Sequence, residues 1–184
     1  WNYLPTNSWS MVNNISSTVT AIDSTGTLYT WGVNNQGQLG DGTTIAKSSP
    51  IQIGSKSWSM VSGGPSYSTA IDSTGALYTW GYNTNGQLGD STTSNRSSPV
   101  QIGTSSWSMV SCGGSHTMAL LASSGALYTW GDNSQGQLGD STTTNKSSPA
   151  QVGTSSWSMI SAGYYHIASL LASSGALYTW GYNV

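Results

Sequence analysis

The sequence predicts an all-β fold made of four repeated units, each a sheet of four strands. Two tryptophan series carry this prediction, one opening the string Trp-Ser-Met and one inside Leu-Tyr-Thr-Trp-Gly, both recurring every 49 or 50 residues. The first series is Trp9, Trp58, Trp107 and Trp157, and the second is Trp31, Trp80, Trp130 and Trp180. Between them recur Gly-Gln-Leu-Gly-Asp and Ser-Ser-Pro. No segment keeps a 3.6-residue apolar period, so helices are not expected.

Three strands of each unit follow from short segments bounded by Gly and Ser. In the third unit they are 107–111, 116–121 and 126–130, each carrying aromatic, β-branched or other apolar side chains. The turn Asp72-Ser-Thr-Gly75 joins the second and third strands of the second unit, and its Gly suits the left-handed residue of a hairpin loop. The corresponding loop is one residue longer in the last two units, which accounts for the change from 49 to 50.

A fourth strand is expected after each Ser-Ser-Pro, as in Pro99-Val-Gln-Ile102, because a proline at the first residue of a strand costs no ladder bond. This strand is expected to be the first of its unit, with Tyr3-Leu-Pro-Thr6 as a degenerate copy in the first unit. This grouping divides the single repeat domain, residues 1–184, into units at approximately 1–34, 50–83, 99–133 and 149–183.

Both faces of such a sheet need cover, so the units are expected to stack around a closed ring or along an open array. Strict alternation along a strand puts Trp31 and Tyr29 on one face. The same alternation puts Trp9 and Met11 on one face and Val12 on the other.

The composition excludes several classes of function. Charged residues make up 5% of the 184 residues, with four Lys or Arg, six Asp and a net charge of −2. No basic footprint for nucleic acid is present. No apolar run approaches the roughly 20 residues of a spanning helix, so membrane insertion is not expected. Cys112 is the only cysteine and reads as a small buried residue.

Residues that carry chemistry are few, and they favour a protein without catalysis, cofactor or metal. Five of the six aspartates fall at repeated positions, where an Asp caps a turn. His116 and His166 occupy equivalent positions in adjacent units, but no acidic or thiolate partner accompanies them as a metal site requires. The Gly-Gln-Leu-Gly loops lack the Lys and the helix of a phosphate-binding loop.

The recurring motifs resemble one known family. Trp-Gly-x-Asn-x-x-Gly-Gln-Leu-Gly occurs at 80–89 and 130–139, and Gly-x-x-His-x-x-Ala-Leu occurs at 113–120. These patterns are similar to the regulator of chromosome condensation repeat, over essentially the whole chain. The resemblance implies a β-propeller, usually of seven blades, and structural hydrogen-bonding roles for His116 and His166. The family's functions are diverse, so the resemblance implies no particular partner.

Four blades depart from the usual number in that family. The chain is therefore expected to be part of a larger ring, or to associate with copies of itself through its end blades. Because all blades are alike, head-to-tail pairing gives a dimeric ring if the rotation closes and an open filament if it does not.

Candidate binding residues come from the places where the blades differ. The stretch 107–133 differs from 157–183 at 8 of 27 positions, and the differences gather in one loop and in the residue after Trp-Gly. Loops on a rigid scaffold are where binding sites are usually built. The candidates are Tyr82, Asp132, Tyr164, Tyr165 and Tyr182.

Two functions are consistent with these observations. The near-identical repeats favour a non-enzymatic, self-associating structural protein of an extracellular or particle surface, where a Ser/Thr/Asn-rich exterior is suitable. The alternative is a propeller module that binds a protein or glycan through blade loops on one face. The blade-specific pair Tyr164-Tyr165 favours this second interpretation.

Overall fold

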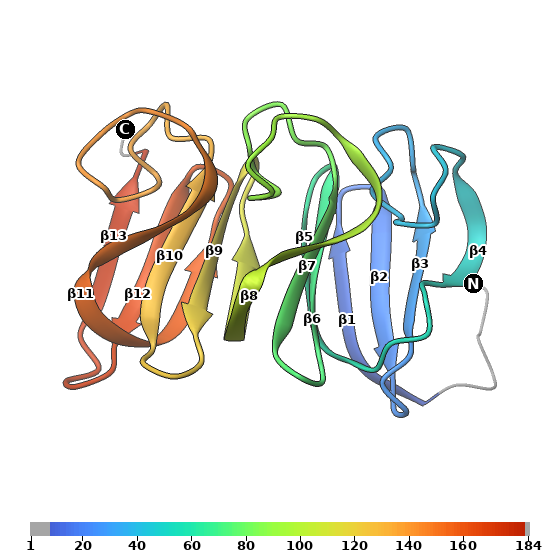
Figure 1. Cartoon of the computed structure of the whole chain (residues 1–184), viewed down its shortest axis with the longest axis horizontal. Coiled ribbons are helices and arrows are strands. Elements are labelled where there is room, and N and C mark those ends of the chain that lie inside the picture. Colours follow the sequence, from blue (N-terminus) through green and yellow to red (C-terminus); the bar gives the residue numbers. More distant parts are fainter. Residues whose placement is uncertain (1–7, 183–184) are drawn as a thin grey trace.

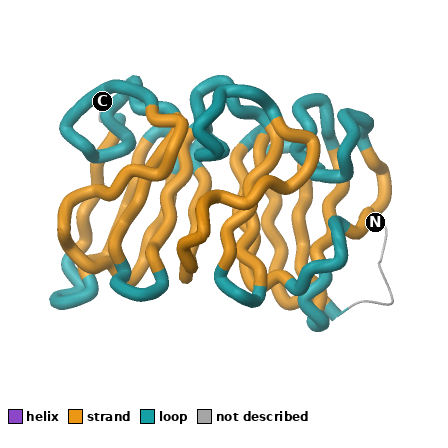
Figure 2. Tube along the Cα trace, viewed as in Figure 1, coloured by secondary structure: helices purple, strands orange, loops and turns teal. Residues whose placement is uncertain are grey.

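A computed structural model describes residues 8–182 of the chain. Within this range every regular element is a β-strand, and the strands stand side by side in a row of sheets (Figure 1). Figure 2 shows the loops gathered at the two ends of these strands. None of the described residues forms a helix long and apolar enough to span a membrane. The all-β class predicted from the sequence is confirmed.

The first sheet, blade 1, is a four-stranded antiparallel meander in chain order. Its strands are β1 (Trp9–Ile15), β2 (Thr18–Asp23), β3 (Leu28–Gly32) and β4 (Lys47–Gln52).

The other nine strands are hydrogen-bonded in one continuous series, from β5 to β13. Two 17-residue strands, β8 and β11, cause this continuity, because each leaves one sheet and enters the next. Blade 2 is β5 to β7 with the first part of β8, and blade 3 is the rest of β8, β9, β10 and the first part of β11. Blade 4 is the rest of β11, β12 and β13, three strands among the described residues. The bounds are β5 (Trp58–Gly64), β6 (Tyr67–Asp72), β7 (Ala76–Gly81), β8 (Arg96–Cys112), β9 (His116–Leu121), β10 (Ala126–Gly131), β11 (Lys146–Ala162), β12 (His166–Leu171) and β13 (Leu177–Gly181).

The proline-containing strand pairs differently from the grouping expected from the sequence. It lies beside the Leu-Tyr-Thr-Trp strand that precedes it, with Tyr29 opposite Gln52 in blade 1 and Tyr78 opposite Gln101 in blade 2. The Tyr78 hydroxyl donates to the Gln101 side-chain oxygen at 3.1 Å, which fixes this register. Blades 1, 2 and 3 therefore each end with the proline strand that was expected to open the next unit. The degenerate strand predicted at 3–6 lies outside the described residues.

A β-bulge changes which side chains share a face. The register shifts between Trp58 and Met60, and equivalent shifts occur in the other three blades. As a result Trp58 and Val61 pack against blade 1, whereas Met60 packs toward blade 3. The predicted sharing of a face by Trp9 and Met11 is therefore wrong, because strict alternation does not hold across a bulge.

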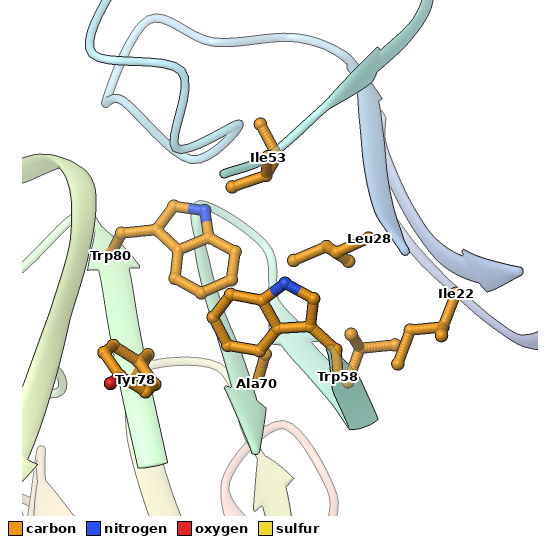
Figure 3. Close-up of a cluster of buried hydrophobic side chains, with 8 residues drawn as sticks. Ile22, Leu28, Ile53, Trp58, Ala70, Tyr78 and Trp80 are labelled. Carbon is orange, nitrogen blue, oxygen red and sulfur yellow. The ribbon is translucent and has the colours of Figure 1, made fainter. Parts of the chain in front are cut away.

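The core lies between the blades. At the first junction, Ile22, Leu28 and Ile53 of blade 1 meet Trp58 and Trp80 of blade 2 (Figure 3). The two indole rings are 6.4 Å apart, centroid to centroid. The same arrangement recurs at the next two junctions. Each blade thus buries its apolar faces only when a neighbour stands on both sides.

Aspartates cap the hairpin turns as predicted. Asp72 Oδ1 accepts bonds from the amide nitrogens of Thr74 and Ala76 at 2.9 and 3.1 Å, and from the Thr74 hydroxyl at 2.6 Å. These donors hold the pKa of Asp72 below its ordinary value, although burial acts in the opposite direction and is the largest single influence. The turn is therefore fixed as an Asx turn.

Candidate interaction surface at the loop edge

The loops after the Trp-Gly pairs of blades 1, 2 and 3 are each held by a buried asparagine. In blade 2, Asn83 Oδ1 accepts the Leu88 amide at 2.9 Å, and Asn83 Nδ2 donates to Asp90 at 3.1 Å and to the Thr92 carbonyl at 3.1 Å. The equivalent asparagines of blades 1 and 3 make the same bonds. Sequence reasoning missed this role, although the fixed Asn in the Trp-Gly-x-Asn motif signals it. These loops form a preorganised edge.

Each Gly-Gln-Leu-Gly loop also clamps the following blade. The Gln87 carbonyl accepts from Trp130 Nε1 at 3.0 Å and from the Thr117 hydroxyl at 2.8 Å. Gly89, two residues after Gln87, has a φ of +74°, and a Cβ at this position would lie 2.6 Å from Trp130 Nε1. A glycine is required because the indole of the next blade occupies the space of a side chain.

The two places where the blades differ are neighbours in space. The amide of the residue after Trp-Gly donates to the carbonyl of the loop between the first two strands of the same blade. The pairs are Val33 to Ser17 at 2.9 Å, Tyr82 to Ser66 at 2.9 Å, Asp132 to Ser115 at 2.8 Å and Tyr182 to Tyr165 at 3.0 Å. Both variable positions therefore lie at one end of each blade, and we call this end the loop edge.

Three of the five candidate residues come together at the loop edge of blade 4. The rings of Tyr164 and Tyr165 are 4.5 Å apart and nearly perpendicular, and those of Tyr165 and Tyr182 are 5.9 Å apart. Their side chains are 58%, 44% and 51% exposed, respectively. We call these three residues the tyrosine cluster. Its base is fixed to blade 3, since the Gly114 amide donates to the Tyr164 carbonyl at 3.0 Å.

Two hollows flank the tyrosine cluster. One of about 520 Å³ is lined by His166, Trp180 and Tyr182, with neighbouring backbone. A smaller one of about 130 Å³ has Pro65, Cys112 and Tyr164 among its walls. Exposed aromatic rings beside concave surface are the features of a contact site for a macromolecule.

The other two candidates lie apart from the cluster. Tyr82 is half-buried at the loop edge of blade 2. Asp132 accepts from Gln137 Nε2 at 2.8 Å and from the Ser134 amide at 3.2 Å, so its carboxylate holds its own loop. A binding role for all five residues stays a prediction.

The two histidines differ in surroundings. His116 is completely buried and neither ring nitrogen has a hydrogen-bond partner among the described residues, whereas His166 is exposed. Burial lowers the pKa of His116 to about 4, so the ring is neutral at pH 7. The His116 ring packs against Gly113, where a Cβ would lie 2.2 Å from the ring. The hydrogen-bonding role that the resemblance implied for the two histidines stays a prediction.

Cys112 lies in the core, as predicted, with 6% exposure. Its sulfur is 3.3 Å from the Thr69 hydroxyl, and burial raises the pKa of the thiol. Within residues 8–182 no three His, Cys, Asp or Glu side chains gather as a metal site would require.

All four basic side chains are paired with an aspartate. Three of the pairs stand within the loop after Trp-Gly, and the fourth joins Lys56 to a turn aspartate. The distances are 3.2 Å for Lys47–Asp41, 3.3 Å for Lys56–Asp72, 2.6 Å for Arg96–Asp90 and 3.1 Å for Lys146–Asp140. Cationic charge is thus distributed around the blades and neutralised locally.

Stacked four-stranded antiparallel sheets, with tryptophans between them and a clamping loop from each blade to the next, define a β-propeller repeat protein. The chain belongs to the regulator of chromosome condensation (RCC1) repeat family. The sequence model of the RCC1 repeat matches residues 25–71, 74–120 and 124–170, and a second model of that repeat matches 60–87 and 109–137. The family predicted from the motifs is confirmed.

Solved structures show the same fold. Human WBSCR16 has a TM-score of 0.85 and 23% identity, over 97% of this chain and 49% of that one. Yeast RCC1 (Prp20) bound to Kap60 has a TM-score of 0.84 and 17% identity, over 98% of this chain and 45% of that one. Prp20p from Saccharomyces cerevisiae, described with its binding to Gsp1p and histones, gives 0.74 and 17%, over 85% and 42%. The chain spans about half the length of these structures. A search of the curated proteins finds no match.

These relatives correct the location expected from the composition. WBSCR16 and Prp20 are intracellular proteins, so the prediction of an extracellular or surface-associated protein is wrong. A Ser/Thr/Asn-rich exterior keeps any propeller hydrated and is not specific to proteins outside the cell.

Proposed function

We propose that this chain is a non-enzymatic, protein-binding propeller module, with the tyrosine cluster of blade 4 as its contact site. The observation that carries the proposal is the packing of Tyr164, Tyr165 and Tyr182 into one exposed patch between two hollows. Tyrosine offers a large amphipathic surface with few rotamers to lose, and it is enriched at interface centres.

The relatives support a protein as the partner. One yeast structure is a complex of RCC1 (Prp20) with Kap60. The other, of Prp20p, is described together with its binding to Gsp1p and histones. Binding of this kind favours an interaction role over catalysis. The local pairing of all four basic side chains favours a protein over a nucleic acid, because phosphate binding relies on accessible cations. A purely structural role has no support from these relatives, so we place the binding module first.

Substitution of the cluster tests the proposal. Wild-type chain and a Tyr164→Ser/Tyr165→Ser double variant are immobilised and exposed to cell extract, with Ile45→Ser as the control. Ile45 is 66% exposed and lies in the loop between β3 and β4, so it matches the cluster in exposure. We expect a protein that cross-links to the loop edge of blade 4 and binds the double variant at least tenfold more weakly, while Ile45→Ser binds normally.

Two results would contradict the proposal. Equal binding of every captured protein to wild type and double variant would remove the cluster as a contact site. Binding to an immobilised glycan array that the double variant loses, without a protein partner, would establish the glycan-binding alternative instead.

A further inference from the structure

The glutamines of the Gly-Gln-Leu-Gly loops hold their side-chain amides in one orientation in blades 1, 2 and 3. The side-chain oxygen of each accepts the backbone amide of the residue two positions earlier. These bonds are Gln36 to Gln38 at 2.9 Å, Asn85 to Gln87 at 3.0 Å and Gln135 to Gln137 at 2.8 Å. Because turning the side-chain amide over would break this bond, Nε2 faces the same side of its loop in each blade.

The three blades differ in the group that accepts from Nε2. Gln38 Nε2 donates to the side-chain oxygen of Asn35 at 3.4 Å, and Gln137 Nε2 donates to the Asp132 carboxylate at 2.8 Å. Gln87 Nε2 has no hydrogen-bond partner among residues 8–182, although Gln87 is completely buried. A buried donor without an acceptor lowers stability, so a ligand that supplies the acceptor gains from it.

Blade 3 shows which group fits at this position. The Asp132 carboxylate also accepts from the amide and the hydroxyl of Ser134, each at 3.2 Å. In blade 2 the residues that correspond to Asp132 and Ser134 are Tyr82 and Thr84. Thr84 has the same amide and hydroxyl donors as Ser134, and it is exposed. Blade 2 therefore has the three donors that hold a carboxylate in blade 3, but no carboxylate of its own at that position.

The two loops also agree in their backbone. The Gly86 amide donates to the Asn83 carbonyl at 2.9 Å, and the Gly136 amide donates to the Asn133 carbonyl at 2.9 Å. Gly86 and Gly136 have φ angles of +80° and +73°. The donors of blade 2 are therefore placed relative to one another as they are in blade 3.

We propose that the loop edge of blade 2 binds a carboxylate, namely the side chain of an aspartate or glutamate on a partner protein. Thr84 and Gln87 form this carboxylate site and donate to the ligand as their counterparts donate to Asp132. A charged acceptor fits best, since the bond to Asp132 is shorter than the bond to the neutral Asn35. Binding requires the half-buried Tyr82, at the position of Asp132, to move aside. That the ligand belongs to a protein rests on the proposed function, whereas the carboxylate site itself does not.

Titration of the whole chain with sodium acetate, followed by NMR, tests the site without a partner. We expect the side-chain amide signals of Gln87 to shift, with half-saturation in about the millimolar range for a ligand of four non-hydrogen atoms. The signals of Gln137 are the internal control and should stay in place, because Asp132 already occupies the equivalent site. Sodium chloride at equal ionic strength controls for the effect of salt.

Two peptides then test a protein side chain as the ligand. Acetyl-Gly-Asp-Gly-amide carries the carboxylate, and acetyl-Gly-Asn-Gly-amide carries a neutral group of the same size. We expect the Asp peptide to shift the Gln87 signals and to bind at least tenfold more tightly than the Asn peptide.

Two reciprocal substitutions test the correspondence with Asp132. Tyr82→Asp gives blade 2 the residue of blade 3, and it should weaken acetate binding at Gln87 at least tenfold because an intramolecular carboxylate occupies the site. Asp132→Tyr gives blade 3 the residue of blade 2, and it should make the Gln137 signals respond to acetate. Each variant carries a residue that another blade already has at the same position, and circular dichroism checks that both fold.

Four outcomes would contradict the inference. Gln87 signals that stay in place up to about 100 mM acetate, well above the expected half-saturation, would overturn the carboxylate site. An undiminished response in Tyr82→Asp would overturn it as well. Equal binding of the two peptides would show that a neutral acceptor is sufficient, and a response to acetate without a response to the Asp peptide would overturn the protein side chain as the ligand.

The test is independent of the proposed function. A response to acetate and to the Asp peptide, together with a cell extract from which no protein is captured, would contradict the proposed function and leave the carboxylate site established. Capture of a protein that depends on the tyrosine cluster, with Gln87 signals that do not respond to acetate, would do the reverse.

Discussion

Blades 3 and 4 are nearly the same sequence in two different surroundings. Within residues 8–182, blade 3 packs against blades 2 and 4, whereas blade 4 packs against blade 3 alone. Leu127 and Leu177 both stand in Gly-Ala-Leu-Tyr-Thr-Trp, yet they are 0% and 65% exposed. His116 and His166 occupy the same position, and only His116 is buried. The energetic weight of a residue in this fold therefore depends on the adjacent blade more than on the residue's own sequence context.

The largest expected difference is between two leucine truncations. Leu127→Ala leaves a cavity in a packed junction and should lower the free energy of unfolding by about 3 kcal/mol. Leu177→Ala removes an exposed side chain and should lower it by less than about 0.5 kcal/mol. Urea unfolding of both variants, at a dilution where the chain is monomeric, measures the two values. Similar losses would show that blade 4 is covered in solution.

The histidine pair gives a pH-dependent version of the same comparison. Burial lowers the pKa of His116 from the ordinary 6.5 to about 4. Between these values the unfolded chain binds a proton that the folded chain does not, so the free energy of unfolding falls as the pH falls, by about 3 kcal/mol over the window. Below this pH window, protonation of aspartates whose pKa values are lowered in the folded chain reduces the free energy of unfolding further.

Urea unfolding at steps between pH 7 and pH 4 measures this loss. His116→Tyr introduces the residue that blade 2 carries at Tyr67 and should flatten the dependence. His166→Gln is the matched control and should keep the wild-type slope. A slope that persists in His116→Tyr would assign the pH dependence to another group.

A glycine pair isolates the contact between a loop and the following blade. Gly86 and Gly136 both have positive φ, +80° and +73°, so alanine adds left-handed strain of about 1 kcal/mol at either position. Only at Gly86 would the new Cβ meet a neighbour, the Cα of Ser147 at 2.6 Å. Gly86→Ala should therefore lower the free energy of unfolding by about 2 kcal/mol in total and Gly136→Ala by about 1 kcal/mol. Equal losses in thermal unfolding would mean that the loop yields.

The smallest effect concerns the ion pairs. Arg96→Met should lower the free energy of unfolding by about 0.5 kcal/mol, because the Arg96 side chain is 37% exposed and solvent weakens its pair with Asp90, even though Arg96 Nε approaches to 2.6 Å. Lys146→Met should cost less, since Asp140 is the more exposed partner and the pair is longer, 3.1 Å. High salt should reduce both losses. A loss that is insensitive to salt would point to packing of the Arg96 stem.

The strand content, the repeat and the family were predictable because the tryptophan and glycine positions recur with the structure itself. The bulge after Trp58 was not, since inserting one residue reverses the faces and leaves no mark in the apolar pattern. The pairing of the proline strand was not either. In sequence order, the strand after Pro99 comes between the strands of two sheets, so it could pair with either. Cross-strand contacts such as Tyr78 with Gln101 determine which sheet it joins.

The sequence was sufficient to predict where on each blade the candidate residues lie, but not which of them lie together. Comparing blades located the loop edge, because residues that differ among otherwise identical units stand out. It could not show that Tyr164, Tyr165 and Tyr182 meet while Tyr82 remains two blades away. It also could not show that the Asp132 carboxylate accepts a hydrogen bond from Gln137 of its own loop. Distances between blades depend on stacking, which periodicity alone does not contain.

The sharing of β8 and β11 between neighbouring sheets bears on how this molecule comes apart. Because one uninterrupted backbone strand is the last member of one sheet and the first of the next, tension applied to either sheet reaches the other directly. Blades 2 to 4 should then unfold together under a mechanical pull. Blade 1 should detach as a separate event, because residues 53–57 interrupt the series of strands between β4 and β5.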